Sequence, residues 1–141
     1  MLPVHLQHLC GLLWITYIRC DFSVGDSECD HVGMSDSDLC CLYSNMLENA
    51  VEACLRVKTG QRVIRVAVVR PGSESLTITV WNNTDGNVRV NGDSYLSSKE
   101  EGRMGYGLRS IQSITEKYGG EACFSWDKRE RMFECKVTVT A

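Results

Sequence analysis

Asp38-Leu-Cys-Cys-Leu-Tyr-Ser-Asn45-Met-Leu-Glu-Asn49-Ala-Val-Glu52-Ala53 is the stretch that decides the fold of this chain. At the rotation of an α-helix, about 100° per residue, its apolar side chains fall on a single arc. The arc consists of Leu39, Leu42, Tyr43, Met46, Leu47, Ala50, Ala53 and Cys54. Ser35 or Ser37 can cap the amino end, and Thr59-Gly60 closes the segment. We therefore predict a long helix over Asp38–Val57 that packs its apolar arc against a core.

The polar side of this helix carries an unusual set of residues. Asn45, Asn49 and Glu52 lie within about 60° of one another, opposite the apolar arc. A solvated helix face normally carries Lys, Glu, Gln or Arg, whereas Asn costs about 0.5 kcal/mol or more relative to Ala inside a helix. The three residues therefore form either a solvated face or a binding site, and their spacing alone leaves both alternatives open.

Outward from this helix, runs of apolar residues between turn residues predict strands, and a second helical period predicts another helix. The expected elements are a leading helix within residues 1–17, a strand near Ile18–Val24, a hairpin of strands Arg62–Arg70 and Ser75–Asn82, a helix Gly105–Tyr118, and strands Ala122–Trp126 and Met132–Val139. In the helix Gly105–Tyr118 we expect Leu108, Ile111, Ile114 and Thr115 to face inward. Gly119-Gly120 should end it. We predict one domain over residues 1–141, of the α+β class. It is a two-layer α/β sandwich whose mixed, mostly antiparallel sheet is covered on one face by helices.

The charge balance argues against several partners. Over 141 residues, 15 Lys and Arg oppose 18 Asp and Glu, which leaves a formal net charge of −3. Such a chain has no basic field for nucleic acid or anionic lipid, so we expect neither nucleic-acid binding nor membrane contact. The apolar run Leu9–Ile18 is too short to cross a bilayer and follows no Lys/Arg-rich segment, so we expect neither a membrane span nor a targeting segment.

Eight cysteines stand out in the composition. An even number can indicate a disulfide framework, but the chain has no Cys-x-x-Cys pair, and Cys40 and Cys41 are adjacent within the helical pattern. The cysteines at positions expected in the core are Cys10, Cys54, Cys123 and Cys135. We expect reduced, mostly buried thiols in a cytosolic protein.

Closely spaced glycines lead into the second predicted helix. Gly102-Arg-Met-Gly105-Tyr106-Gly107-Leu108 follows the polar, Gly-containing stretch Asn83–Arg103, which is longer than most loops of a compact domain. Backbone N–H groups of such glycines, together with a helix amino end, favour an anion. The segment is neither a Rossmann fingerprint, since no strand precedes it, nor a Walker loop, since it lacks Gly-Lys-[Ser/Thr]. It predicts a phosphate site next to a mobile lid.

A third feature is Asn82-Asn83-Thr-Asp85-Gly86 at the end of a predicted strand. Turn chemistry accounts for Asp85-Gly86. Asn82 differs from these residues because it ends the strand.

Together these features resemble the ATP-binding (Bergerat) domain shared by gyrase, the large heat-shock chaperone, histidine kinases and MutL, most closely the quorum-sensing and citrate-sensor branch of sensor histidine kinases. The stretch 38–53 resembles the N box of that branch. Gly105-Tyr-Gly-Leu-Arg-Ser-Ile111 with Glu116-Lys-Tyr-Gly-Gly120 resembles its second glycine box, and Ser97-Ser-Lys99 its lid motif. The resemblance extends from about Ile18 to the end of the chain and implies that residues 83–104 are the ATP lid.

The resemblance assigns ligand contacts to individual residues. Asn49 matches the magnesium-binding Asn, and a carbonyl oxygen suits a hard cation. Asn82 stands where most of the superfamily has the adenine-reading Asp of an Asp-x-Gly-x-Gly box, which is absent here, and an amide can pair with adenine in its place. The remaining implied contacts of Mg-ATP are Asn45, Glu52, Lys99, Arg103, Gly105, Tyr106, Gly107 and Leu108, with Lys99 and Arg103 as lid cations.

Asn45 bears on the reaction. In gyrase-like branches a Glu at this position activates water, but an amide cannot take up a proton at any useful pH. A histidine nucleophile has a free lone pair and needs no base, so Asn45 fits phosphoryl transfer to histidine rather than hydrolysis.

The implied function is the catalytic part of a cytoplasmic protein-histidine kinase, the soluble part of a membrane-bound sensor. It would pass the γ-phosphoryl group of Mg-ATP to a histidine on a dimerisation domain absent from this chain, and then act with a response regulator. We expect His5, His8 and His31 to be surface or half-buried residues rather than the acceptor. The alternatives are a stand-alone anti-sigma-factor-like serine kinase and a degenerate, non-catalytic nucleotide-binding module.

Overall fold

The structure, a computed structural model, describes residues 18–24, 33–72, 75–85, 89–91, 94–96 and 106–140. Its elements in chain order are β1 (Ile18–Val24), α2 (Asp36–Leu55), β2 (Arg62–Gly72), β3 (Ser75–Asn83), β4 (Arg89–Asn91), β5 (Ser94–Leu96), α3 (Tyr106–Lys117), β6 (Glu121–Asp127) and β7 (Met132–Thr140). Several predictions fall outside the described residues: the leading helix within 1–17, Cys10, the three histidines, Lys99, Arg103 and Gly105.

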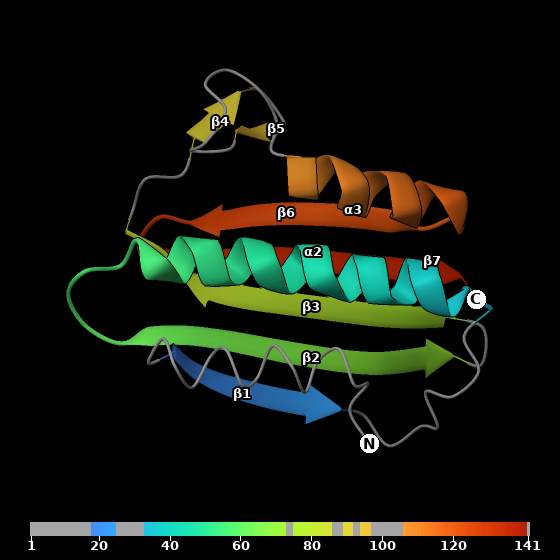
Figure 1. Cartoon of the computed structure of the whole chain (residues 1–141), viewed down its shortest axis with the longest axis horizontal. Helices are drawn as coiled ribbons and strands as arrows, with labels where there is room; N and C mark the ends of the chain where they lie inside the picture. The colour runs from blue at the N-terminus through green and yellow to red at the C-terminus, as the bar shows by residue number, and fades with distance from the viewer. Residues whose placement is uncertain are drawn as a thin grey trace.

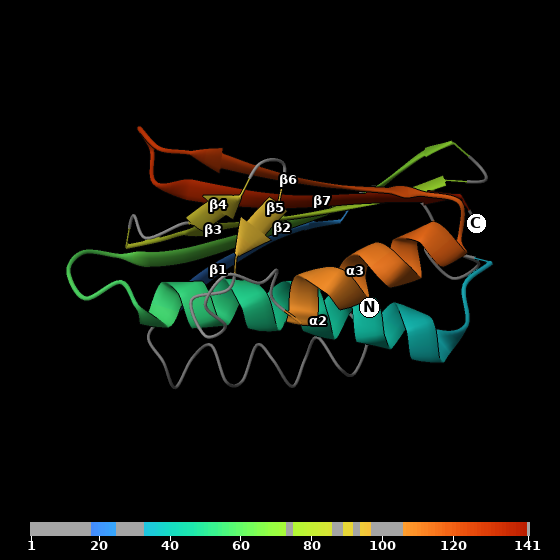
Figure 2. The same cartoon turned by 90° about the horizontal axis from the view of Figure 1, so that it is seen from above.

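The main sheet has five strands in the order β1-β2-β3-β7-β6. The pair β1-β2 is parallel, and the other three pairs are antiparallel. Helices α2 and α3 lie side by side and cover one face of the sheet (Figures 1 and 2). The predicted α+β sandwich with a mixed, mostly antiparallel sheet is confirmed.

The core lies between the two layers. Every residue of the predicted α2 arc is buried except Leu39, which is half-buried at the edge of the core. Every second residue of the sheet strands packs against the apolar arc of α2. For example, Ile78 of β3 pairs with Val137 of β7, and both are fully buried. Leu108 and Ile111 bring α3 into the same cluster. Each such side chain contributes about 1.5–3 kcal/mol by leaving water, so the apolar arcs hold the layers together.

Helix α2 is displaced by two residues from its predicted bounds. Ser35 caps it, because the Ser35 hydroxyl accepts a hydrogen bond from the Asp38 N–H at 3.1 Å. At the other end the Arg56 N–H turns back to the carbonyl of Ala53, and the helix ends at Leu55 rather than Val57. Gly60, with φ +89°, lies in the connection that follows.

The predicted stop of α3 is confirmed. Gly119 has a left-handed backbone conformation, φ +63°. At Gly120 a Cβ atom would stand 2.1 Å from the carbonyl oxygen of Thr138. This turn therefore brings α3 back onto β7 at a distance that only glycine permits.

The stretch Asn83–Arg103 contains more regular structure than predicted. Strand β3 continues through Asn83, and β4 pairs with β5 in an antiparallel two-stranded sheet. The missed signal was Asn91-Gly92-Asp93 between short runs with β-branched or aromatic residues, a typical hairpin pattern.

The cysteines are less buried than predicted. Cys54 and Cys135 are buried, and loss of hydration raises the pKa of their thiols to about 11 and about 12. Cys40, Cys41 and Cys123 are exposed, and these three are free thiols, as are Cys54 and Cys135. The prediction is wrong for Cys123 because β6 alternates, and its neighbours Ala122 and Phe124 are the residues that pack against the core.

One further finding concerns membranes. In the ranges given above, neither helix combines the length and the apolar character that crossing a bilayer requires.

Candidate nucleotide-binding site

The polar stripe predicted on α2 is present in the structure. Asn45 and Asn49 are half-buried and Glu52 is exposed. The Asn45 side-chain nitrogen lies 3.4 Å from the Cys41 sulfur, a weak acceptor. The Asn49 side chain makes no hydrogen bond within the described part of the chain. The two amides therefore keep most of their hydrogen-bonding capacity for a ligand.

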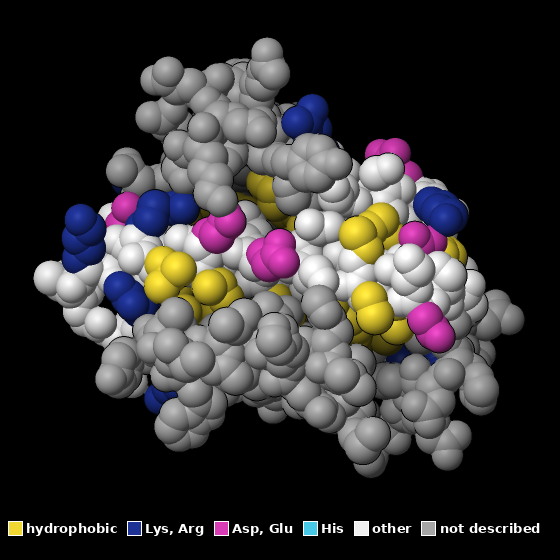
Figure 3. Space-filling view, in the orientation of Figure 1, with side chains coloured by type: hydrophobic (Ala, Val, Ile, Leu, Met, Phe, Trp, Pro, Cys, Tyr) yellow, Lys and Arg dark blue, Asp and Glu magenta, His cyan; other side chains and the backbone are white. Residues whose placement is uncertain are grey.

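Charge is distributed unevenly along this face. In Figure 3 acidic side chains lie over the middle of α2, and basic side chains gather at the end where α2 leads into β2. Glu48, like Glu52, is exposed on α2. An oxygen-rich, acidic stripe favours a hard divalent cation over a bare phosphate.

Helix α3 begins beside the middle of α2 (Figures 1 and 2). Leu108 is buried and anchors this end of α3, whose first turn consists of Tyr106, Gly107 and Leu108. The first N–H groups of a helix have no partner within it and carry a partial positive charge. The Tyr106–Leu108 part of the predicted glycine box thus brings the amino end of α3, with its partial positive charge, next to the helix that carries the asparagine stripe.

Asn82 lies on the face of β3 that points toward the helices. It is paired with Ile64 of β2 and Phe133 of β7, and only 1% of it is exposed. In the described part of the chain its side chain makes a single hydrogen bond, from Nδ2 to the Asn83 carbonyl at 3.1 Å. A buried amide has two donors and an acceptor to satisfy, so Asn82 has spare capacity at the end of the strand.

With this geometry in place, the chain can be compared with known proteins. The profile of the GHKL domain family matches residues 34–140. The chain belongs to the GHKL family. No curated protein shows significant similarity to the sequence.

Several solved structures share the fold of this GHKL domain. The nucleotide-free catalytic domain of the histidine kinase ThkA is similar with a TM-score of 0.70 and 16% identity, over 96% of this chain and 90% of that one. The mycobacterial sensor histidine kinase MprB is similar with a TM-score of 0.68 and 13% identity, over 96% of this chain and 90% of that one. The cytoplasmic segment of the histidine kinase QseC is similar with a TM-score of 0.63 and 17% identity, over 96% of this chain and 69% of that one. The predicted family and fold are confirmed.

Asn83 is a residue of this GHKL domain whose role the sequence analysis missed. Its Oδ1 accepts the Val63 N–H at 2.9 Å, and its Nδ2 donates to the Gln61 carbonyl at 2.6 Å. The Cys54 thiol of α2 lies 3.4 Å from the same Oδ1. Asn83 therefore joins the end of β3 to the start of β2 and to α2, whereas the sequence placed it at the start of a loop.

A cavity of about 480 Å³ is lined in part by Asn83, Thr84 and Asp85, the first residues of the predicted lid, but by none of the residues predicted to contact Mg-ATP. Its walls are Arg56, Val57, Lys58, Thr59, Gln61, Asn83, Thr84, Asp85, Glu130 and Arg131. The GHKL stripe of Asn45, Asn49 and Glu52 is therefore separate from this cavity.

Proposed function

We propose that this chain is the ATP-binding catalytic domain of a sensor histidine kinase. It binds Mg-ATP and transfers the γ-phosphoryl group to a histidine on a dimerisation domain. The observation that carries the proposal is the GHKL family match over residues 34–140, which includes the stripe of Asn45, Asn49 and Glu52. The histidine-kinase catalytic domains that share its fold support the same function.

The chemistry of the stripe fits a magnesium ion. Asn49 offers a carbonyl oxygen that no described residue occupies, and the acidic side chains of α2 lie nearby. In our proposal Asn49 holds Mg²⁺, and nucleotide phosphates and water complete its coordination. When bound, Mg²⁺ neutralises charge that develops on the phosphates during transfer.

The other proposed contacts divide by the part of the nucleotide that they bind. Asn82 pairs with the adenine edge through its unused amide groups. The backbone N–H groups of Gly105 and Gly107, with Tyr106 and Leu108 in the same turn, bind the phosphates. Lys99 and Arg103 bring positive charge from the lid, residues 83–104.

Asn45 sets the choice of acceptor in this proposal. An amide does not remove a proton from water, so the domain provides no general base at this position. A neutral imidazole attacks the phosphorus with its own lone pair. The proposed partners are accordingly the histidine-bearing domain of the same kinase and a response regulator, in the cytoplasm, and the quorum-sensing branch stays a prediction.

Two measurements test this function. Calorimetry should show that the chain binds Mg-ATP and Mg-ADP, with negligible ATP hydrolysis by the chain alone. No binding at millimolar nucleotide would refute both the kinase and the serine-kinase alternative, and rapid hydrolysis would contradict the argument from Asn45.

The acceptor is identified by the stability of the product. A dimerisation hairpin supplied in trans should gain a phosphoryl group that is lost in acid and kept in alkali, as the P–N bond of phosphohistidine requires. An acid-stable phosphoryl group on a serine would favour the stand-alone serine kinase instead.

A further inference from the structure

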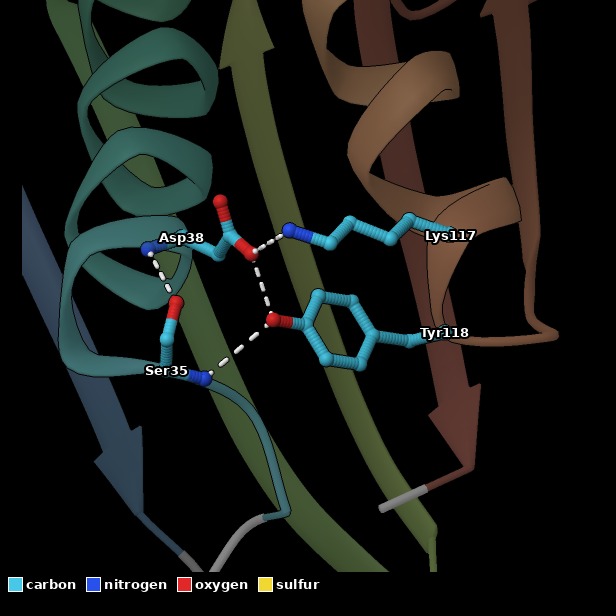
Figure 4. Close-up of polar contacts among 4 residues, drawn as sticks. All are labelled: Ser35, Asp38, Lys117 and Tyr118. Carbon is cyan, nitrogen blue, oxygen red and sulfur yellow. Dashed lines mark hydrogen bonds and ion pairs between the residues drawn. The ribbon is translucent and has the colours of Figure 1, made fainter.

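Three residues of the two motifs that have no ligand contact in the proposed site contact each other in the structure. Asp38 begins the N-box stretch, and Lys117 and Tyr118 belong to the Glu116–Gly120 part of the glycine box. Figure 4 shows the Asp38 Oδ2 atom between them: the Lys117 ammonium lies 2.7 Å away, and the Tyr118 hydroxyl donates a second hydrogen bond. The Tyr118 hydroxyl also accepts the Ser35 N–H at 3.2 Å. We call Asp38, Lys117 and Tyr118 the helix tie.

Local electrostatics favour the helix tie. Asp38 is in the first turn of α2, where the helix dipole stabilises an anion, and Lys117 is in the last turn of α3, where it stabilises a cation. The hydrogen bonds from Lys117 and Tyr118 lower the pKa of Asp38, and the bond to Asp38 raises the pKa of Lys117. The Asp38 side chain is 21% exposed and that of Lys117 is 63% exposed, so water reaches this ion pair and its directional hydrogen bonds matter more than its charge.

The helix tie also fixes the register of the two helices. Helices α2 and α3 run in opposite directions, so the amino end of one lies beside the carboxyl end of the other (Figure 1). Eleven residues separate Asp38 from Asn49, and eleven separate Lys117 from Tyr106. At 1.5 Å per residue each distance is about 16 Å. With Asp38 beside Lys117, α3 therefore begins beside the middle of α2, where the asparagine stripe lies (Figures 1 and 2).

A shift of one helical turn would change this arrangement. Sliding α3 along α2 by one turn, about 5.4 Å, would move its amino end by the same distance relative to Asn45 and Asn49. Packed helices can shift by one turn between two discrete arrangements. The close approach of Gly120 to Thr138 positions the carboxyl end of α3 on β7, and the helix tie adds a directional three-residue contact between α3 and α2.

We propose that the helix tie is a positioning device for the phosphate end of the nucleotide: it holds the backbone N–H groups at the start of α3 beside the asparagine stripe of α2, so that both reach the same phosphates. The proposal rests on the proposed function. Asp38, Lys117 and Tyr118 touch no ligand and act through the placement of Tyr106 and Gly107.

The test compares a ligand that has phosphates with one that lacks them. Mg-ADP and adenosine are titrated separately into the full chain, and the two dissociation constants are measured by NMR. The variants are Asp38→Asn and the milder Tyr118→Phe, which keeps the ring and removes only the hydroxyl. Asp36→Asn is the matched control, since Asp36 is an exposed acid in the same first turn of α2.

Loss of the helix tie should weaken Mg-ADP binding roughly 3- to 30-fold, the usual range for an indirect coupling, and leave adenosine binding within about twofold. Asp36→Asn should change neither constant. General destabilisation would instead weaken both ligands in parallel, and an unchanged ratio in both variants would refute the positioning role. If the wild-type chain binds neither ligand, the proposed function fails together with the inference. If Asp38→Asn does not fold, the ratio in Tyr118→Phe decides.

Discussion

The first turn of α2 and its middle are both polar, but their side chains are used differently. In the first turn, Asp38 has two partners from the end of α3 and sits beside the Ser35 cap. In the middle, Asn45 has only a weak sulfur contact, and Asn49 has no hydrogen bond to the described residues. Paired polar side chains hold two helices in place, and unpaired ones keep their capacity for a ligand. The comparison predicts that mutations at the two places affect different measurements.

The largest effect is expected for Asn49→Ala. It should lower Mg-ATP affinity to the value measured in EDTA, a loss of at least the roughly 10–100-fold that removing an outer-shell partner of a metal costs. The melting temperature should stay close to that of the wild type, because Asn49 makes no hydrogen bond or ion pair with the described residues. Calorimetry with and without Mg²⁺ checks this, with exposed Asp36→Asn in the first turn of the same helix as control. Magnesium-dependent binding that survives Asn49→Ala would contradict the assignment.

The neighbours Asn82 and Asn83 show the same contrast within strand β3: the Asn83 side chain is paired with other segments of the chain, whereas the Asn82 side chain keeps unused capacity for a ligand. Asn83→Ala should destabilise the domain by about 1–3 kcal/mol, because the Val63 N–H loses its acceptor. Asn82→Ala should chiefly weaken binding of the adenine ring, and Asn82→Asp, which restores the residue common in the superfamily, should keep it. Urea denaturation and ATP titration of the three variants separate the two roles. Equal effects of Asn82→Ala and Asn83→Ala on both measurements would remove the distinction.

The exposed thiol of Cys41 offers a smaller but direct test of the stripe. Cys41 lies one turn before Asn45 and contacts its amide, so bound Mg-ADP should slow alkylation of Cys41 several-fold. Cys123 is exposed on the opposite side of the sheet from the helices and is the internal control. Mass spectrometry in a Cys40→Ser background gives both rates. Equal protection of Cys41 and Cys123 would place the nucleotide elsewhere.

The smallest expected effect is the pH dependence of the helix tie. The pKa of Asp38 is lowered in the folded domain, so its contribution is present above the pKa of an unfolded Asp and is lost as the pH falls through the lower folded value. The pKa of Lys117 is raised, so its contribution is lost only as the pH rises above that of an ordinary lysine. Melting temperatures of wild type and Asp38→Asn should therefore converge in acid. A difference that grows on acidification would have the wrong sign.

The sequence could predict much of the fold because short-range patterns carry it. The arc of α2, the hairpin β2-β3 and the glycine stop of α3 each depend on residues a few positions apart. The stripe of Asn45, Asn49 and Glu52 could be predicted for the same reason, since one helical period brings those residues together. The β4-β5 pairing was missed because its short strands contribute little apolar pattern.

The sequence by itself therefore determined which residues face the core, where the helices and main strands lie, and which asparagines share a helix face. Only the tertiary structure decided which polar residues are paired: Asp38 and Tyr118, 80 positions apart, and Asn83 with Gln61 and Val63. The physical reason is one of range. Helical and strand periods act within a few residues, whereas a hydrogen bond between distant segments exists only once the packing of layers has set their register.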